Sequence, residues 1–172
     1  MPTTVESPPA APSVATLVVH FVNSIKQVLS TMAGIPVTVG APCHKKSPAP
    51  SYDVSAIISF SGEFVGSMVL SFQQNAAITI VGKFAGLPVP PDSPDFPDAV
   101  GELANMIAGS AKASFNSVVS ISVPSVIIGS GHTVARLQGV PCVVIPCQTS
   151  AGDFAVEINL KPMNAPQAPR SN

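Results

Sequence analysis

Charged side chains are scarce in this chain, and the two signs nearly balance. Only 10% of its 172 residues are Asp, Glu, Lys or Arg, and the formal net charge is -1. A protein that binds nucleic acid or anionic lipid needs a basic surface to neutralise phosphate groups. The composition therefore argues against nucleic acid and against a membrane surface as partners.

We expect no segment for export or membrane anchoring among these residues. Residues 1–13 contain Glu6 and several prolines but no basic stretch followed by an apolar core, so they do not form a secretory signal. Residues 16–33 are apolar enough to raise the question of a membrane span. Polar side chains interrupt that segment: His20, Asn23, Ser24, Lys26 and Gln27. We therefore expect a soluble, cytoplasmic protein.

Cysteine occurs only three times, so the thiols cannot all pair with one another. A zinc site can be imagined from Cys43, His44, Cys142 and Cys147, but structural zinc sites show tighter paired spacings. We expect buried or half-buried thiols and no metal site. His132 lies in a glycine-rich turn, where we expect a solvated side chain.

Familiar nucleophilic and phosphate-binding motifs are missing too. The sequence shows no Ser-His-Asp order, no G-x-S-x-G and no glycine loop that would cradle phosphate. Any catalysis must therefore depend on other polar groups.

Apolar residues, in contrast, are abundant. They make up 46% of the chain, which at this length predicts one folded domain with a sizeable core. Residues 1–13 and 161–172 are rich in Pro, Ala and Ser and nearly lack large apolar side chains. We expect them to be flexible tails on a domain formed by residues 14–160.

Hydrophobic periodicity predicts an α+β fold. Helices are expected at residues 14–33, at residues 76–85 and after Pro97. Strands are expected at residues 37–39, 52–61, 63–72, 124–128, 142–148 and 154–160, with a loop at 41–51. The inner face of the second helix is expected to carry Ile78, Val81, Phe84 and Ala85. One mainly antiparallel sheet with the helices packed on one face is the economical assembly.

The third predicted helix carries a polar stripe. Residues 101–109 read G-E-L-A-N-M-I-A-G, and Glu102 and Asn105 project together because they lie three residues apart. The same face collects Asp98, Glu102, Asn105, Gly109, Lys112 and Asn116. The opposite face is apolar: Val100, Leu103, Ala104, Ile107, Ala111 and Phe115. Pro97 suits the first turn, and Asp95 or Ser93 is expected to cap it.

This nine-residue string resembles the signature helix of the CheX/CheC family of chemotaxis phosphatases, which remove phosphate from the response regulator CheY. The family pattern is a Glu, two spacers, an Asn and a Gly four residues later, here Glu102, Asn105 and Gly109. The resemblance extends more weakly over residues 14–160, including the segment V-P-S-V-I-I-G at 123–129. Only one such motif is present, so the chain resembles the single-motif CheX type.

The resemblance implies a role for each residue of the stripe. Asn105 would orient the water that attacks the aspartyl phosphate of a CheY-like receiver, and Glu102 would pair with a receiver lysine. Gly109 would allow close approach of the partner, with Asp98 and Lys112 as further docking residues. The protein would need no cofactor of its own, because Mg²⁺ is expected in the receiver. Family members of this type form homodimers by pairing and exchanging edge strands.

Other functions stay open on the sequence alone. The domain could dock a receiver without dephosphorylating it, or dimerise as an accessory part of a larger signalling assembly. The stripe could also be no more than a solvated helix face. Neither the receiver nor the pathway can be identified from these residues.

Overall fold

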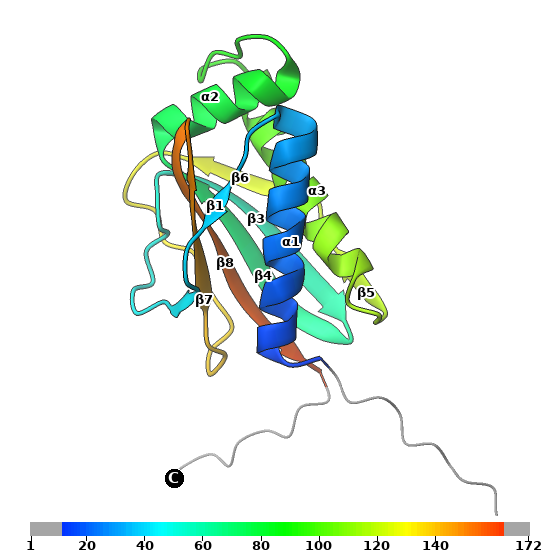
Figure 1. Ribbon diagram of the computed structural model, residues 1–172. Helices are drawn as coiled ribbons and strands as arrows, with labels where there is room; N and C mark the ends of the chain where they lie inside the picture. Colours follow the sequence, from blue (N-terminus) through cyan, green and yellow to red (C-terminus); the bar gives the residue numbers. More distant parts are fainter. Residues whose placement is uncertain (1–11, 164–172) are drawn as a thin grey trace, which may run out of the picture.

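The computed structural model describes residues 12–163, which form three helices and one eight-stranded sheet (Figure 1). The helices are α1 (Val14–Ala33), α2 (Gln74–Ala85) and α3 (Asp95–Ala113). The strands are β1 (Thr38–Val39), β2 (Cys43–His44), β3 (Val54–Gly62), β4 (Phe64–Phe72), β5 (Val119–Ile121), β6 (Ser125–Ile128), β7 (Val143–Thr149) and β8 (Gly152–Pro162). The predicted tails fall almost wholly outside the described residues, so the domain limits stay a prediction.

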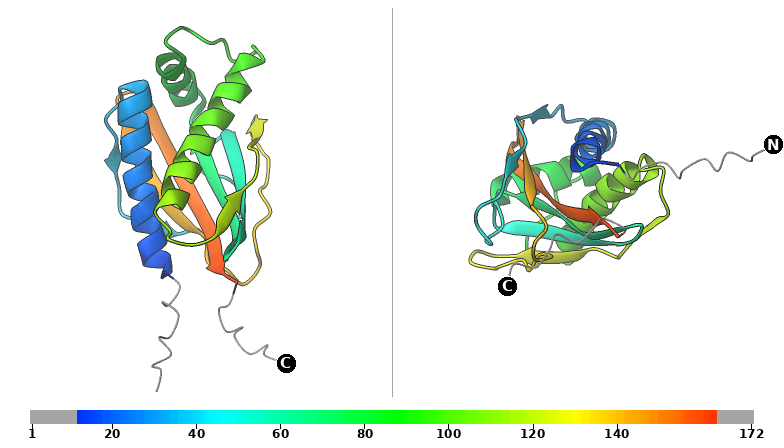
Figure 2. Two further views of the ribbon diagram at one scale, coloured as in Figure 1. Left: turned by 90° about the vertical axis from the view of Figure 1, so that its right-hand side faces the viewer. Right: turned by 90° about the horizontal axis from the view of Figure 1, so that it is seen from below.

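Every strand pairing in the described part is antiparallel. The strand order is β1-β7-β8-β4-β3-β5, with β2 also pairing β7 and β6 also pairing β3. The helices cover one face of the sheet, while the connection from β6 to β7 crosses the other face (Figure 2). The predicted α+β class and the placement of the helices are confirmed. None of the helices in residues 12–163 is long and apolar enough to cross a membrane.

Local signals define α1. Ser13 caps its start, because its side-chain oxygen accepts the Thr16 N–H at 3.2 Å. Gly34 ends it in the left-handed conformation, with φ of 63°. Leu17, Phe21, Ile25 and Leu29 form its fully buried stripe. The predicted bounds of this helix are confirmed.

The third helix also has its predicted apolar back. Pro97 lies in the first turn of α3. The N-cap residue is Pro94, so the helix has no side-chain cap, and the expected capping by Asp95 or Ser93 is wrong; Ser93, in the turn before the helix, instead accepts the Asp95 N–H at 3.2 Å through its Oγ. The buried face comprises Phe96, Val100, Gly101, Leu103, Ala104, Ile107, Ala108 and Ala111. The helix ends at Ala113, so Asn116 lies beyond it.

Two short strands escaped prediction. β2 falls inside the expected loop at residues 41–51, and β5 precedes the expected strand at 124–128. Segments of two or three residues are too short to show alternation, and these pair only because β7 and β3 offer them free edges.

The predicted inner face of α2 is right for Val81 and wrong for Ala85. The buried residues are Ala76, Ala77, Ile80 and Val81, whereas Ala85 is exposed and Ile78 and Phe84 are only half-buried. A Cβ built on Gly152 would lie 2.9 Å from Ala76 Cβ, so the helix approaches the β7–β8 turn closely. Such an approach requires small residues at the contact, which turns the alanines inward.

Strand β8 alternates as predicted, but both of its faces are buried. Phe154, Val156, Ile158 and Leu160 belong to the core beneath the helices. The outer side chains Ala155, Glu157 and Asn159 are buried as well. Residues 129–142, here called the outer strap, cross this face of the sheet (Figure 2) and contact both Glu157 and Asn159. Leu137 N–H donates to Asn159 Oδ1 at 2.8 Å, which fastens the outer strap to the sheet.

Candidate active site

The solvent side of α3 presents a row of polar residues. Asp98 and Glu102 are exposed, and Asn105, Gly109 and Lys112 are half-buried. We call these five residues the polar stripe. Within residues 12–163, no hydrogen bond or ion pair engages the side chains of Glu102 and Asn105. A free carboxylate and a free carboxamide are therefore available to a bound molecule.

The two glycines Gly101 and Gly109 of α3 differ in how closely the rest of the fold packs against them. A Cβ on Gly101 would lie 3.0 Å from Pro124 Cγ, so the helix packs closely enough against this proline that a larger residue would force a shift. A Cβ on Gly109 would meet nothing closer than Ile121 Cδ1 at 4.0 Å, which is ordinary van der Waals contact. The fold itself therefore does not require glycine at position 109.

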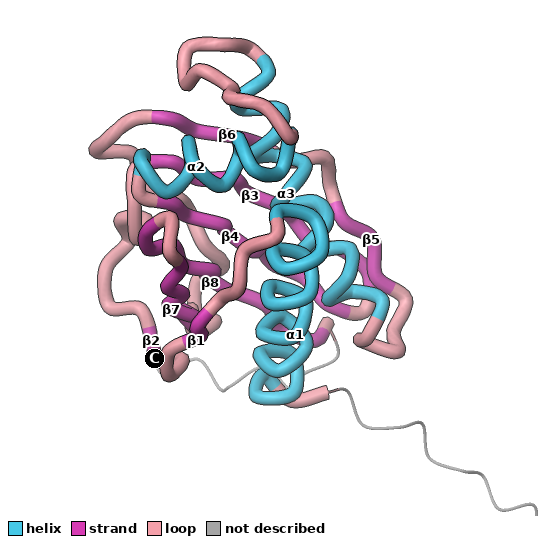
Figure 3. Tube along the Cα trace, turned by 45° about the horizontal axis from the view of Figure 1, so that its top comes forward, coloured by secondary structure: helices cyan, strands magenta, loops and turns pink. Residues whose placement is uncertain are grey.

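Helices α1 and α3 lie side by side (Figure 3). Residues of both helices line a hollow of about 380 Å³ that adjoins the polar stripe. Its lining comprises Gln27, Val28, Thr31, Met32, Met106, Gly109 and Ser110. On the other flank, Val123 is 84% exposed next to Pro124, which packs on Gly101. Apolar surface therefore borders the polar stripe on both sides.

A second charged cluster lies on the opposite face of the sheet. The Glu157 carboxylate is 1% exposed, with Lys45 Nζ at 2.9 Å and Arg136 Nη2 at 2.6 Å. Ser51 donates to it through both its backbone N–H and its hydroxyl, each at 2.8 Å. Burial acts to raise the pKa of Glu157, but the hydrogen bonds from Lys45, Ser51 and Arg136 outweigh it and lower the pKa.

This cluster holds loops in place, and its Glu157 carboxylate is already paired with Lys45 and Arg136. Arg136 belongs to the outer strap and also donates to the Ser47 and Pro48 carbonyls, so it ties the strap to the loop before β3. This cluster could not be predicted from the sequence, because its members come from three separate segments that only the sheet register brings together.

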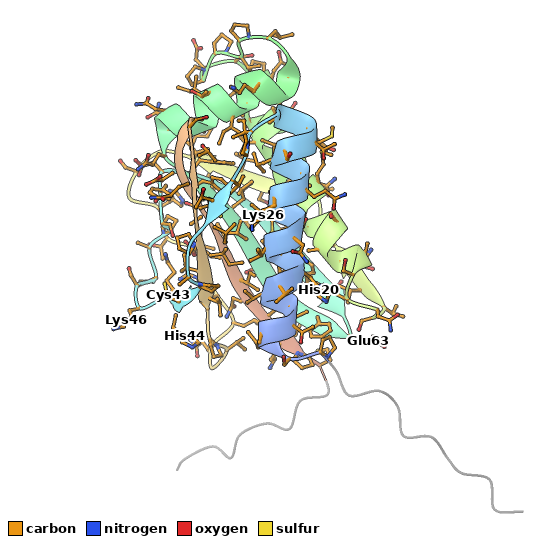
Figure 4. All side chains as sticks on the ribbon, in the orientation of Figure 1. His20, Lys26, Cys43, His44, Lys46 and Glu63 are labelled. Atoms are coloured by element: carbon orange, nitrogen blue, oxygen red, sulfur yellow. The ribbon has the colours of Figure 1, made fainter. Side chains whose placement is uncertain are left out.

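The cysteines do not assemble a metal site. No three His, Cys, Asp or Glu side chains of the described residues are grouped so that they could hold a metal ion. Cys142 and Cys147 are buried as expected, and burial raises the pKa of Cys147 to about 12. Cys43 is exposed, contrary to expectation, because β2 lies at a sheet edge; Figure 4 shows it beside His44, away from α3.

The expectation of a solvated His132 holds only in part. Its ring is half-buried, with Nδ1 at 2.8 Å from the Gly129 carbonyl oxygen and Nε2 at 3.1 Å from Ser55 Oγ. The outer strap folds back over β3, which covers part of this side chain. Its position on the far face of the sheet separates it from the polar stripe.

Known proteins share both the sequence pattern and the fold. The family model for Chemotaxis phosphatase CheX matches residues 54–148. The crystal structure of a chemotaxis protein CheX from Desulfovibrio desulfuricans is 36% identical, with a TM-score of 0.77 over 85% of this chain and 98% of that one. A putative chemotaxis protein from Desulfovibrio vulgaris Hildenborough is 38% identical, with a TM-score of 0.76 over 84% and 96% of the two chains.

A more distant structure shares the fold. A chain of the CheX-CheY-BeF3-Mg²⁺ complex from Borrelia burgdorferi is 21% identical, with a TM-score of 0.70 over 84% of this chain and 97% of that one. Among proteins of curated function, none matches the chain. The family match covers more than half of the sequence and includes the whole of α3, so the chain belongs to the Chemotaxis phosphatase CheX family.

Proposed function

We propose that this protein accelerates hydrolysis of the aspartyl phosphate on a CheY-like receiver domain in chemotaxis or related two-component signalling. The observation that carries the proposal is the pair of free side chains, Glu102 and Asn105, on the solvent side of α3. Membership of the CheX family supports it, as does the shared fold with a CheX solved together with CheY.

Asn105 would position the attacking water. A carboxamide is a poor base, but it can both accept and donate hydrogen bonds and so hold a water molecule in one orientation. Hydrolysis of an acyl phosphate relies mainly on in-line placement of the nucleophile and on charge stabilisation. The receiver would supply the phosphorylated aspartate, and the Mg²⁺ we expect in its own site would neutralise developing charge on the phosphoryl oxygens.

Glu102 would set the register between the two proteins. An exposed carboxylate that meets a lysine across an interface contributes more to orientation and association rate than to affinity. With Glu102 held by the receiver, Asn105 lies one helical turn away on the same face and is directed at the phosphoryl group. Gly109 would allow close contact, and Asp98 and Lys112 would extend the docking surface.

We further propose that the protein is a cytoplasmic homodimer joined through sheet edges. The edge that carries β5 and β6 exposes apolar side chains, with Val118 79% exposed and Ile128 43% exposed. An apolar edge with unpaired backbone groups favours pairing with a second strand. In a two-fold dimer, the same edge of each copy would pair with the other, so the backbone groups of both edges would be hydrogen-bonded.

The test is turnover with Asn105→Ala. Phosphate release from a phosphorylated CheY-like receiver should accelerate with the wild-type protein and return to the uncatalysed rate with the variant, while receiver binding and the melting temperature stay nearly unchanged. Asn75→Ala is the matched control, because Asn75 is an exposed asparagine at the start of α2. It should retain full activity.

The alternative is a binding module that docks a receiver through the same helix face without catalysis. It would bind the receiver but leave its dephosphorylation rate at the uncatalysed value. Wild-type turnover by Asn105→Ala would contradict the proposed role of Asn105.

A further inference from the structure

Apolar contact accounts for nearly all of the attachment of α3 to the fold. Its buried face combines four large side chains with four small residues: Phe96, Val100, Leu103 and Ile107 with Gly101, Ala104, Ala108 and Ala111. Helices keep their relative position along their axes by fitting ridges of side chains into grooves. Small residues make shallow ridges, so this face resists sliding less than a face of large side chains would.

One directional contact opposes such sliding. Ser24 on α1 is 2% exposed, and its hydroxyl donates to the Ile107 carbonyl oxygen of α3 at 2.7 Å. Among residues 12–163, this is the one hydrogen bond that joins α3 to another helix or strand; the others lie within the helix or at its two ends. A bond of this length has good geometry and favours one axial position of α3 against α1.

The point of attachment is close to the proposed site. Ile107 follows Asn105 by two residues, which is about 3 Å along a helix axis. The backbone between them is regular helix, so a shift at Ile107 would be carried to Asn105. Catalysis by placement of a water molecule is sensitive to such a shift, since about 1 Å of misplacement can cost about 100-fold in rate.

We propose that Ser24 is a positioning residue for Asn105. The proposal rests on the proposed phosphatase function and adds the element that holds its key side chain in place. Ser24 touches neither the receiver nor the water; it acts through the Ile107 carbonyl.

The effect of Ser24 on stability is separable from its effect on position. Inside α3 the Ile107 carbonyl also accepts the amide four residues later, so Ser24→Ala leaves no buried carbonyl without a partner. Ser71 is a matched control, since it is also buried and its hydroxyl donates to the Tyr52 carbonyl at 3.2 Å, on the face of the sheet away from α3. It also accepts the Tyr52 N–H at 2.8 Å, so Ser71→Ala should destabilise the fold at least as much.

The experiment compares kcat and KM for a phosphorylated receiver among wild type, Ser24→Ala, Ser71→Ala and Ser24→Thr. We expect Ser24→Ala to lower kcat about tenfold with KM within about twofold, the signature of lost positioning rather than lost docking. Ser71→Ala should keep the wild-type kcat, and Ser24→Thr, which retains the hydroxyl, should recover at least part of the lost rate.

The outcomes separate the two proposals. An unchanged kcat for Ser24→Ala, or an equal loss for Ser71→Ala, overturns the role of Ser24 and leaves the phosphatase function standing. Absence of acceleration by the wild-type protein with its receiver overturns the proposed function, and the role of Ser24 with it.

Discussion

Replacement of Gly109 by alanine should move stability and activity in opposite directions. Glycine inside a helix costs about 1 kcal/mol relative to alanine. The new Cβ would meet nothing closer than Ile121 Cδ1 at 4.0 Å, so no steric penalty offsets this gain. For a domain of this size, a gain of about 1 kcal/mol raises the melting temperature by roughly 2–4 °C.

The same methyl group would hinder the partner. If the receiver packs directly on the helix at Gly109, the added methyl acts as an overpacked contact, which costs about 1–3 kcal/mol. This corresponds to an association roughly 5-fold to 150-fold weaker. We therefore expect a more stable protein that is a poorer phosphatase, mainly through a higher KM.

Thermal unfolding and phosphate release from a phosphorylated receiver measure the two effects. Gly101→Ala is the control on the same helix, and it should lower the melting temperature because its Cβ would lie 3.0 Å from Pro124 Cγ. A Gly109→Ala variant with wild-type KM would refute the docking role of Gly109. A lower melting temperature for that variant would refute the packing argument.

Three further predictions concern other parts of the molecule. Glu102→Ala should weaken receiver binding and slow turnover, with the loss greatest at low salt; a salt-independent loss would contradict an ionic contact. Because the pKa of Glu157 is lowered in the folded protein, the stability it contributes is complete well above the ordinary glutamate pKa of about 4.3 and is lost as pH falls through the folded pKa. The free energy of unfolding measured with denaturant should therefore fall from about pH 6 to pH 3, and this fall should be smaller in Glu157→Gln. Light scattering at micromolar concentration should return a dimer, and a mass near 17.5 kDa would contradict dimerisation.

Elements defined by local signals could be predicted from the sequence. The serine cap, the buried i, i+4 stripe and the final glycine of α1 all lie within about 20 neighbouring residues, so periodicity and capping rules are sufficient. The same holds for the apolar back of α3. The two-residue strand β2 depends instead on the edge offered by β7, which is about 100 residues away in the chain.

The polar stripe is formed by residues that are close in the sequence, whereas the contacts that hold it in place join residues that are far apart. Glu102 and Asn105 share one helix face, so their spacing alone brings them together, and the proposed reaction needs no third catalytic side chain from this protein. Ser24 and Ile107 are 83 residues apart, and Ser51 and Glu157 are 106 residues apart. Contacts at such separations depend on helix packing and sheet register, to which a single sequence gives no direct access. A phosphatase that borrows its phosphorylated aspartate from the partner can keep its own catalytic groups on one helical turn. The catalytic groups of such a phosphatase can therefore be predicted from a short sequence segment. The precise position of the helical turn that carries them depends on the whole fold.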